Sequence, residues 1–187
     1  MSRFILMPVA MALLLSSMPA RAGTVRDIHT QYEDGIYRLA VDVIIDGRFD
    51  AVYGLVTDYD RLKELSDIFV DTALISPPGV EPKRRRLVAR ACVFLFCDEA
   101  TMVEDVEEIE RKTILTRVVP ELSDFKYGKS RWEVSAVDAD HSRIRFSYEI
   151  QPDFWVPPLI GPYFIKRKLL AAARQTITRI EVLARDG

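Results

Sequence analysis

The sequence predicts an α+β fold in which one curved antiparallel sheet wraps a long C-terminal helix. Two observations predict it: β-type segments fill most of the chain, and an apolar stripe at helical spacing fills its end. About seven strands are expected, with two short helices after the first strand. The chain has 187 residues, the size of one domain, and its 49% of hydrophobic residues exclude a disordered protein.

Charge and rare residue types exclude several classes of function. The net charge is −2, from 26 Lys and Arg against 28 Asp and Glu, whereas a nucleic-acid-binding domain is usually strongly basic. The chain has only 2 His and 2 Cys, too few for zinc ribbons or multi-cysteine clusters. The sequence therefore predicts no nucleic-acid partner, no metal and no cofactor.

Residues 1–22 have the pattern of a secretory signal peptide. Arg3 precedes an apolar run from Phe4 to Leu15, and Ala20-Arg21-Ala22 has the small residues of a cleavage site. The run is shorter than the roughly 20 residues of a membrane span, although an uncleaved anchor is the alternative. We expect cleavage after Ala22 and an exported domain of residues 23–187, located in the periplasm if the source is Gram-negative.

Cys92 and Cys97 flank four apolar residues. In an oxidising compartment such a pair favours a disulfide that clasps the connection between two strands. Two buried thiols are the alternative in a reducing compartment. A redox-active pair is disfavoured because the C-x-x-C spacing is missing.

The first expected elements are a strand and two short helical segments. Ile36–Ile45 is rich in β-branched residues and is predicted to be a strand that ends at Asp46-Gly47. Apolar residues recur at helical spacing over Phe49–Thr57, which predicts a short amphipathic helix. Asp60 is expected to cap a second short turn that runs through Leu65.

The middle of the chain is predicted to form successive strands. Residues 99–110 also fit a helix face, but their neighbours favour a strand. Over residues 143–150, apolar side chains at even positions alternate with polar ones at odd positions, which is typical of a half-buried antiparallel strand. The expected strands are residues 68–75, 84–92, 99–110, 113–119, 129–137 and 143–150.

The last element is a long helix. Prolines between Pro152 and Pro158 interrupt the sheet, and neither Gly nor Pro occurs from Tyr163 until Gly187. A helix of about 24 residues is therefore expected. Its apolar stripe consists of Leu170, Ala173, Ile177, Ile180 and Ala184.

This order of elements resembles the START-like (SRPBCC) superfamily with the helix-grip fold, nearest to its polyketide cyclase and coenzyme Q-binding members. The segment from Phe49 to Asp60 is similar to that family's first helix, including the Asp58-Tyr59 pair at its end. The segment from Phe146 to Phe154, followed by Val156-Pro157-Pro158 and a long helix, is similar to the last strand and closing helix. The resemblance spans about residues 35–185.

The resemblance implies an elongated apolar cavity between sheet and helix, with a filled core of the same residues as the alternative. An aromatic cluster of Tyr148, Phe154 and Trp155 would lie at its entrance or, alternatively, pack an ordinary turn. The expected cavity lining is Trp132, Val134, Phe146, Tyr148, Ile150, Phe154, Trp155, Phe164, Leu170 and Ile177.

Motifs of known catalytic machinery are missing from the sequence. There is no nucleophile elbow, no His-Glu-x-x-His and no phosphate loop. His29 lies near the expected mature N-terminus, and His141 lies in a predicted turn, where an exposed side chain is expected.

Two kinds of charged run stand out. The acid-rich run Glu104–Glu110 is expected to be a solvated strand edge whose carboxylates split between two faces. The basic runs Lys83–Arg86 and Lys166–Lys168 are expected to be solvated, with contact to anionic lipid headgroups as the alternative.

These observations predict an exported monomer that binds a hydrophobic, lipid- or isoprenoid-like small molecule without turning it over. The first alternative is a cyclase- or aromatase-type enzyme, in which Tyr148, Asp153 or another cavity acid would assist by acid–base chemistry. The second is a scaffold domain with a filled core.

Overall fold

In the computed structural model, the described residues are 24–93 and 96–186. Two predictions fall outside them. The signal peptide of residues 1–22 is one. The disulfide is the other, because the side chains of Cys92 and Cys97 belong to a segment that is not described.

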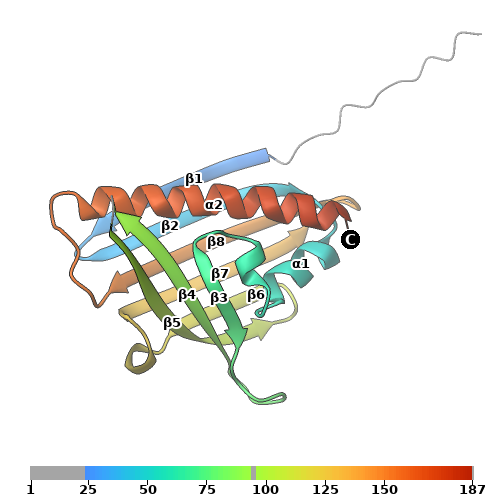
Figure 1. Ribbon diagram of the computed structural model, residues 1–187. Helices are drawn as coiled ribbons and strands as arrows, with labels where there is room; N and C mark the ends of the chain where they lie inside the picture. Colours follow the sequence, from blue (N-terminus) through green and yellow to red (C-terminus); the bar gives the residue numbers. More distant parts are fainter. Residues whose placement is uncertain (1–23, 94–95, 187) are drawn as a thin grey trace, which may run out of the picture.

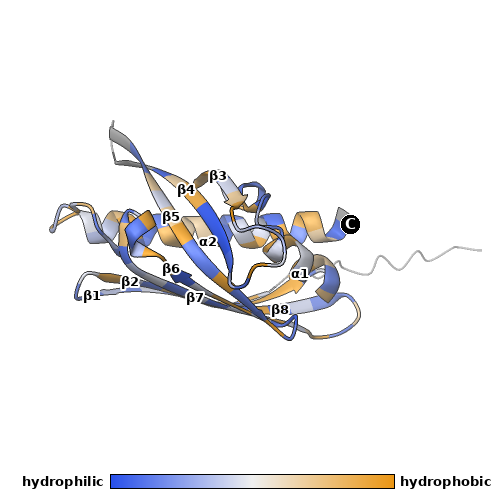
Figure 2. Ribbon diagram, turned by 90° about the horizontal axis from the view of Figure 1, so that it is seen from below, coloured by the Kyte–Doolittle hydropathy of each residue, from blue (hydrophilic) through white to orange (hydrophobic). Residues whose placement is uncertain are grey.

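Within the described ranges, eight strands form one antiparallel sheet in the order β1-β2-β8-β7-β6-β5-β4-β3. The strands are β1 (Thr24–Glu33), β2 (Ile36–Asp46), β3 (Phe69–Leu74), β4 (Lys83–Val93), β5 (Phe96–Ile109), β6 (Thr113–Val118), β7 (Phe125–Ala136) and β8 (His141–Pro152). The helices are α1 (Phe49–Thr57) and α2 (Gly161–Asp186), and two 3-10 turns are η1 (Leu62–Glu64) and η2 (Pro120–Leu122). The sheet curls around α2, which lies on its inner face (Figure 1, Figure 2). The predicted fold class is confirmed, with one strand more than expected.

The additional strand is β1, which sequence reasoning missed. Its side chains are exposed along almost the whole strand, so its sequence has no apolar face to reveal it. It pairs with β2 through a tight hairpin at Asp34 and Gly35, whose φ angles are 51° and 82°. An Asp-Gly pair with positive φ is the turn that suits such a hairpin, and it was the available signal.

The short turn after α1 is not capped by the residue that the sequence predicted. The helix α1 has the predicted bounds, but Asp60 does not cap the following turn. Instead, the Oδ1 atom of Asp60 accepts a hydrogen bond from the backbone N–H of Leu74 at 2.8 Å. Asp60 thus ties the turn to β3, because β3 presents an unpaired backbone donor beside it.

The helix α2 is covered unevenly along its length. Its C-terminal half is closed against the sheet, where Ile180 is 1% exposed. There, a Cβ atom added at Gly47 would lie 2.7 Å from the Cβ atom of Ala184, so β2 and α2 approach closely. In the N-terminal half the sheet-facing residues stay only partly buried; they are Ile165, Leu169, Leu170 and Ala173. No helix in the described part of the chain combines the length and apolarity of a membrane crossing.

Candidate ligand-binding site

Three aromatic side chains line the inner face of β7 and β8. Trp132 lies opposite Phe146 in the strand register, with ring centroids 4.2 Å apart, and the rings of Phe146 and Tyr148 are 6.0 Å apart. All three point inward, yet they keep part of their surface accessible. The matching inward side chains of β2, by contrast, are 0–7% exposed. The inner face is therefore incompletely covered at this aromatic ladder (Trp132, Phe146 and Tyr148).

Most of the predicted lining residues meet at this face. Val134, Ile150 and Ile177 belong to the buried core, and Leu170 is partly buried against it. Phe164 is half-buried, with its ring 5.7 Å from that of Tyr163. Two residues are not brought into the group: Phe154 is 46% exposed and contacts Phe125, and Trp155 is 79% exposed.

A buried row of polar side chains crosses the inner face next to the ladder. Arg85 of β4 donates through Nε to Oε2 of Glu104 on β5 at 2.8 Å. The other carboxylate oxygen accepts from the Thr116 hydroxyl at 3.0 Å, and Thr116 is 2.8 Å from the hydroxyl of Ser130. The polar row (Arg85, Glu104, Thr116 and Ser130) is 1–7% exposed, and each member has a partner.

This burial corrects two expectations. Glu104 was expected on a solvated strand edge, and Arg85 in a solvated turn. Both are buried because β4 and β5 each lie between two other strands, and because alternate residues of a strand point to one face. Arg84 and Arg86, on either side of Arg85 in the chain, point outward. There they pair with Asp105 and Asp71, respectively.

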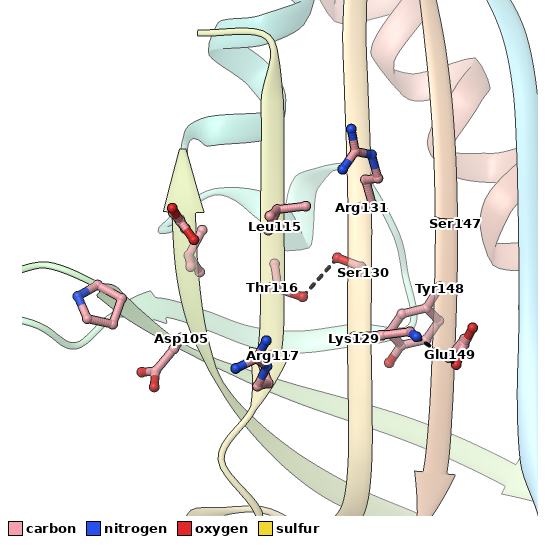
Figure 3. A pocket seen from close by; sticks show the side chains of 13 residues that line it. Asp105, Leu115, Thr116, Arg117, Lys129, Ser130, Arg131, Ser147, Tyr148 and Glu149 are labelled. Carbon is pink, nitrogen blue, oxygen red and sulfur yellow. Dashed lines mark hydrogen bonds and ion pairs between the residues drawn. The ribbon is translucent and has the colours of Figure 1, made fainter. Parts of the chain in front are cut away.

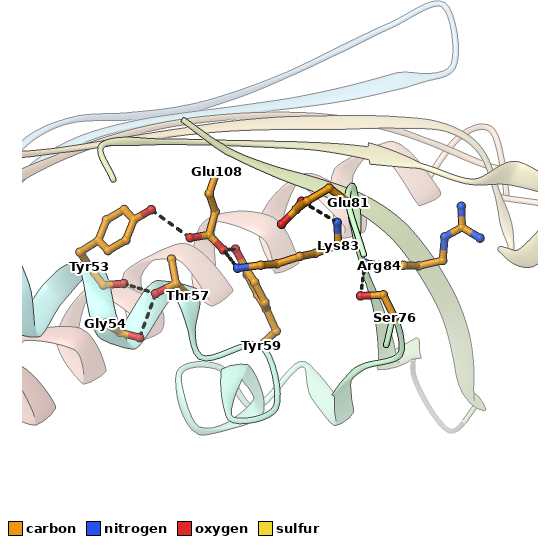
Figure 4. Close-up of polar contacts among 9 residues, drawn as sticks. All are labelled: Tyr53, Gly54, Thr57, Tyr59, Ser76, Glu81, Lys83, Arg84 and Glu108. Carbon is orange, nitrogen blue, oxygen red and sulfur yellow. Dashed lines mark hydrogen bonds and ion pairs between the residues drawn. The ribbon is translucent and has the colours of Figure 1, made fainter. Parts of the chain in front are cut away.

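A second polar group surrounds Glu108 on the inner side of β5 (Figure 4). Its carboxylate accepts hydrogen bonds from the hydroxyl of Tyr53 at 3.2 Å, the hydroxyl of Tyr59 at 2.9 Å and the Nζ atom of Lys83 at 2.6 Å. The guanidinium of Arg85 lies 5.4 Å from the centre of the Tyr59 ring, so this Glu108 cluster (Tyr53, Tyr59, Lys83 and Glu108) adjoins the polar row.

Within the Glu108 cluster, the pKa of the carboxyl group is lowered and the pKa values of the two tyrosines are raised. Burial opposes ionisation of Glu108, but hydrogen bonds from Lys83 and Tyr59 outweigh it and hold the pKa of this carboxyl below its ordinary value. Burial and the Glu108 charge raise the pKa of Tyr53 to about 12 and raise the pKa of Tyr59 as well. At neutral pH the carboxylate is therefore ionised and both phenols are protonated.

Tyr148 connects the aromatic ladder with the polar row. Its ring stacks on Phe146, and it lies opposite Ser130 in the strand register. Its hydroxyl is 3.5 Å from the sulfur of Met102, which is a weak acceptor. Burial and the charge of Glu104 raise the pKa of this hydroxyl well above its ordinary value. Tyr148 thus offers a protonated donor at the boundary between apolar and polar surface.

A separate hollow of about 560 Å³ lies over strands β5 to β8 (Figure 3). Most of its lining side chains alternate with the inward ones, so they face away from α2. Charged groups dominate it: Asp105, Glu107, Arg117, Lys129, Arg131 and Glu149. This charged outer hollow is distinct from the apolar inner face that the sequence predicted.

Comparison with known proteins identifies the family. Residues 37–182 match the model of a family described as polyketide cyclase/dehydrase and lipid transport. The chain belongs to this family. The START-like resemblance inferred from the sequence is thereby confirmed, and membership supports a ligand-binding domain of the START or polyketide cyclase type. No curated protein matches the sequence.

Solved structures share the fold of this START-like domain. A START superfamily protein from Mycobacterium smegmatis is 13% identical with a TM-score of 0.63, covering 80% of this chain and 97% of its own. A STAR-related lipid transfer protein from Xanthomonas axonopodis is 13% identical with a TM-score of 0.60, at 84% and 98% coverage. The Zhui aromatase/cyclase from Streptomyces sp. R1128 is 11% identical with a TM-score of 0.53, at 80% and 91% coverage.

The remaining candidate groups of the START-like domain lie away from its inner face. His29 is exposed and pairs with Asp27, and His141, the first residue of β8, pairs with Asp138. Asp153 is exposed, 3.1 Å from the Nζ atom of Lys126. The polar groups that reach the ladder thus come from β4 to β8. The sequence predicted Tyr148 as a lining residue, but the charged runs that contain Arg85 and Glu104 were expected to be solvated.

Proposed function

We propose that this START-like domain is an exported carrier that holds a hydrophobic, lipid- or isoprenoid-like molecule between sheet and α2 and releases it unchanged. The aromatic ladder carries the proposal, because three inward aromatic side chains keep accessible surface, and the sheet-facing residues in the N-terminal half of α2 are also only partly buried. Such apolar, partly open faces with few polar groups favour apolar ligands. The pattern of residues 1–22 supports export.

The polar row suggests what the ligand carries at one end. Arg85 and Glu104 already compensate each other's charge, so a charged ligand group beside them would leave a buried charge uncompensated. The hydroxyls of Tyr148 and Ser130 are neutral, and they lie where the ladder meets the row. We therefore propose a largely apolar ligand with an uncharged oxygen, such as a hydroxyl or a carbonyl.

A cyclase- or aromatase-type enzyme is the second candidate, because the Glu108 cluster brings four potential proton-transfer groups together: a carboxylate, two phenols and an ammonium group. Acid–base catalysis works best when the pKa of the group lies near the working pH. Here the pKa of Glu108 is lowered and those of Tyr53 and Tyr59 are raised, so each moves away from neutrality. These directions favour binding over turnover.

The primary test is to identify the bound molecule. The protein is purified from the cells that export it, extracted with organic solvent and analysed by mass spectrometry, and uptake of an uncharged fluorescent lipid, a fatty alcohol, is measured in parallel. We expect an apolar molecule in stoichiometric amount. Repeated extracts without one, together with no uptake, would overturn the carrier proposal. Recovery of a chemically altered product after incubation would favour the enzyme.

A matched pair of variants locates the ligand. Ala173 faces the sheet and is partly buried, whereas Ala171 lies on the exposed side of the same helix. Ala173→Phe should abolish uptake with little change in thermal unfolding, because on the carrier proposal the added ring takes the place of the ligand. Ala171→Phe should leave uptake unchanged. If Ala173→Phe instead unfolds the protein, the interior is already filled and the scaffold interpretation holds.

A further inference from the structure

The segment that joins β8 to α2 presents large apolar side chains to solvent. Leu159 is 94% exposed, Trp155 is 79% exposed and Tyr163 is 60% exposed. Phe154 and Ile160, which are 46% and 45% exposed, add to the same segment. This apolar projection (Phe154, Trp155, Leu159, Ile160 and Tyr163) lies at one end of the molecule, where α2 begins (Figure 1). Exposed apolar groups of this size are uncommon on soluble proteins unless they bind something.

A basic run follows the apolar projection immediately. Lys166, Arg167 and Lys168 lie in the first turns of α2, and none of them has an ion-pair partner in the described part of the chain. Arg167 comes four residues after Tyr163, so both lie on the same exposed side of the helix. No acidic residue occurs between Asp153 and Glu181. The net charge of the whole chain is −2, so this positive charge is a local feature.

The other basic run, Lys83–Arg86, differs from Lys166–Lys168 in its ion pairs. The sequence alone leaves both runs the same alternative, contact with lipid headgroups. Every cation of Lys83–Arg86 is paired within the fold, and the partners are Glu108, Asp105, Glu104 and Asp71 in that order. Anions outside the protein would have to displace these carboxylates. Of the two runs, the one on α2 combines unpaired cations with neighbouring exposed apolar residues.

We propose that the apolar projection and Lys166–Lys168 together dock this domain on the surface of an anionic lipid bilayer. Trp and Tyr side chains favour the membrane interface, and cations behind them favour anionic headgroups. The docked end adjoins the N-terminal half of α2, where the sheet-facing side chains are only partly buried. The inference builds on the proposed carrier function, since it names the membrane as the donor or acceptor of the cargo.

Vesicle binding tests the docking surface directly. Vesicles of phosphatidylcholine with about one third phosphatidylglycerol are compared with pure phosphatidylcholine vesicles by flotation, with and without added salt. We expect binding to the anionic vesicles that weakens with salt, accompanied by a blue shift of the tryptophan emission. In Trp155→Phe the blue shift should disappear while binding persists. Equal binding to both kinds of vesicle, with no effect of salt, would overturn the proposal.

Two triple variants separate the charge on α2 from charge in general. Lys166→Gln/Arg167→Gln/Lys168→Gln should weaken binding to anionic vesicles by at least about tenfold. The control, Arg48→Gln/Lys63→Gln/Lys112→Gln, removes the same charge from exposed positions outside α2 and should leave binding unchanged. Equal losses in both variants would contradict the assignment. Residues 1–22 do not affect the comparison, because every variant has the same N-terminus.

A third variant tests the apolar component and the rival partner. Trp155→Ser/Leu159→Ser/Tyr163→Ser should abolish the binding that remains at high salt. Analytical ultracentrifugation is run on both proteins. If the unchanged protein is a dimer and this variant is a monomer, the apolar projection is assigned to self-association instead. If vesicles do not bind but extracts still contain an apolar molecule, the docking inference fails and the carrier proposal stands. If vesicles bind but extracts repeatedly contain no apolar molecule, the carrier proposal fails and the docking surface stands.

Discussion

Arg85 and Glu104 form a buried ion pair between neighbouring strands, with side chains that are 8% and 1% exposed. The two residues lie directly opposite each other in the register of β4 and β5. The Nε atom of Arg85 is 2.8 Å from Oε2 of Glu104, and Thr116 satisfies the other carboxylate oxygen. Because both charges are out of water, loss of either partner leaves the other without compensation.

Glu104→Gln should lower the free energy of unfolding by about 3–5 kcal/mol, since the Arg85 charge stays buried without its counterion. Urea denaturation measures the change. Arg86→Gln is the matched control, because its pair with Asp71 is about half exposed, and it should cost less than about 1 kcal/mol. Equal effects of the two substitutions would show that burial of the pair does not matter.

Glu108→Gln should alter how stability depends on pH. The pKa of Glu108 in the folded protein lies below its ordinary value of 4.5, so its carboxylate contributes stability that is fully present above that value. This contribution is lost as the pH falls through the folded pKa. Thermal unfolding of protein and variant should therefore differ at neutral pH and converge in acid. Glu107→Gln, on the outer face, should show no such convergence. A difference that grows in acid would contradict the assignment.

Gly47→Ala should destabilise the protein by about 1–3 kcal/mol, because the new Cβ atom would lie 2.7 Å from the Cβ atom of Ala184 and the two backbones must separate. Gly54→Ala in α1 provides a control of opposite sign. Nothing lies within 4 Å of its new Cβ atom, and alanine favours the helix, so stability should rise by about 0.5–1 kcal/mol. Chemical denaturation of both variants checks the two signs together.

Tyr148→Phe should weaken ligand binding roughly fivefold to tenfold while the unfolding free energy hardly changes. Among the described residues, the hydroxyl has only the sulfur of Met102 as a partner, at 3.5 Å, so a ligand oxygen is its better acceptor. Titration with the fluorescent ligand measures the effect. Tyr127→Phe removes a hydroxyl from Glu149 instead and should leave affinity unchanged. Equal affinity in both variants would remove Tyr148 from the proposed site.

The sequence predicts those features that depend on local pattern. The bounds of α1 and the inward face of β8 follow from spacing alone, because helical and strand periods differ clearly. The buried pair could not be predicted, since Arg85 and Glu104 are 19 residues apart and meet only in one strand register. A slip of β5 by one residue would send the Glu104 side chain to the opposite face, away from Arg85. The exposure of Trp155 is equally non-local, because it depends on the path of the chain between β8 and α2.

The close approach at Gly47 holds one end of α2 only. At the other end, the sheet-facing residues have loose cover, and the β8–α2 connection leads directly into them. If α2 moves to admit a ligand, the close contact at Ala184 acts as the hinge, and the displacement is largest at the start of the helix. The start of the 26-residue helix carries Tyr163 and Lys166–Lys168 of the proposed docking surface, so these residues would travel furthest in such a movement.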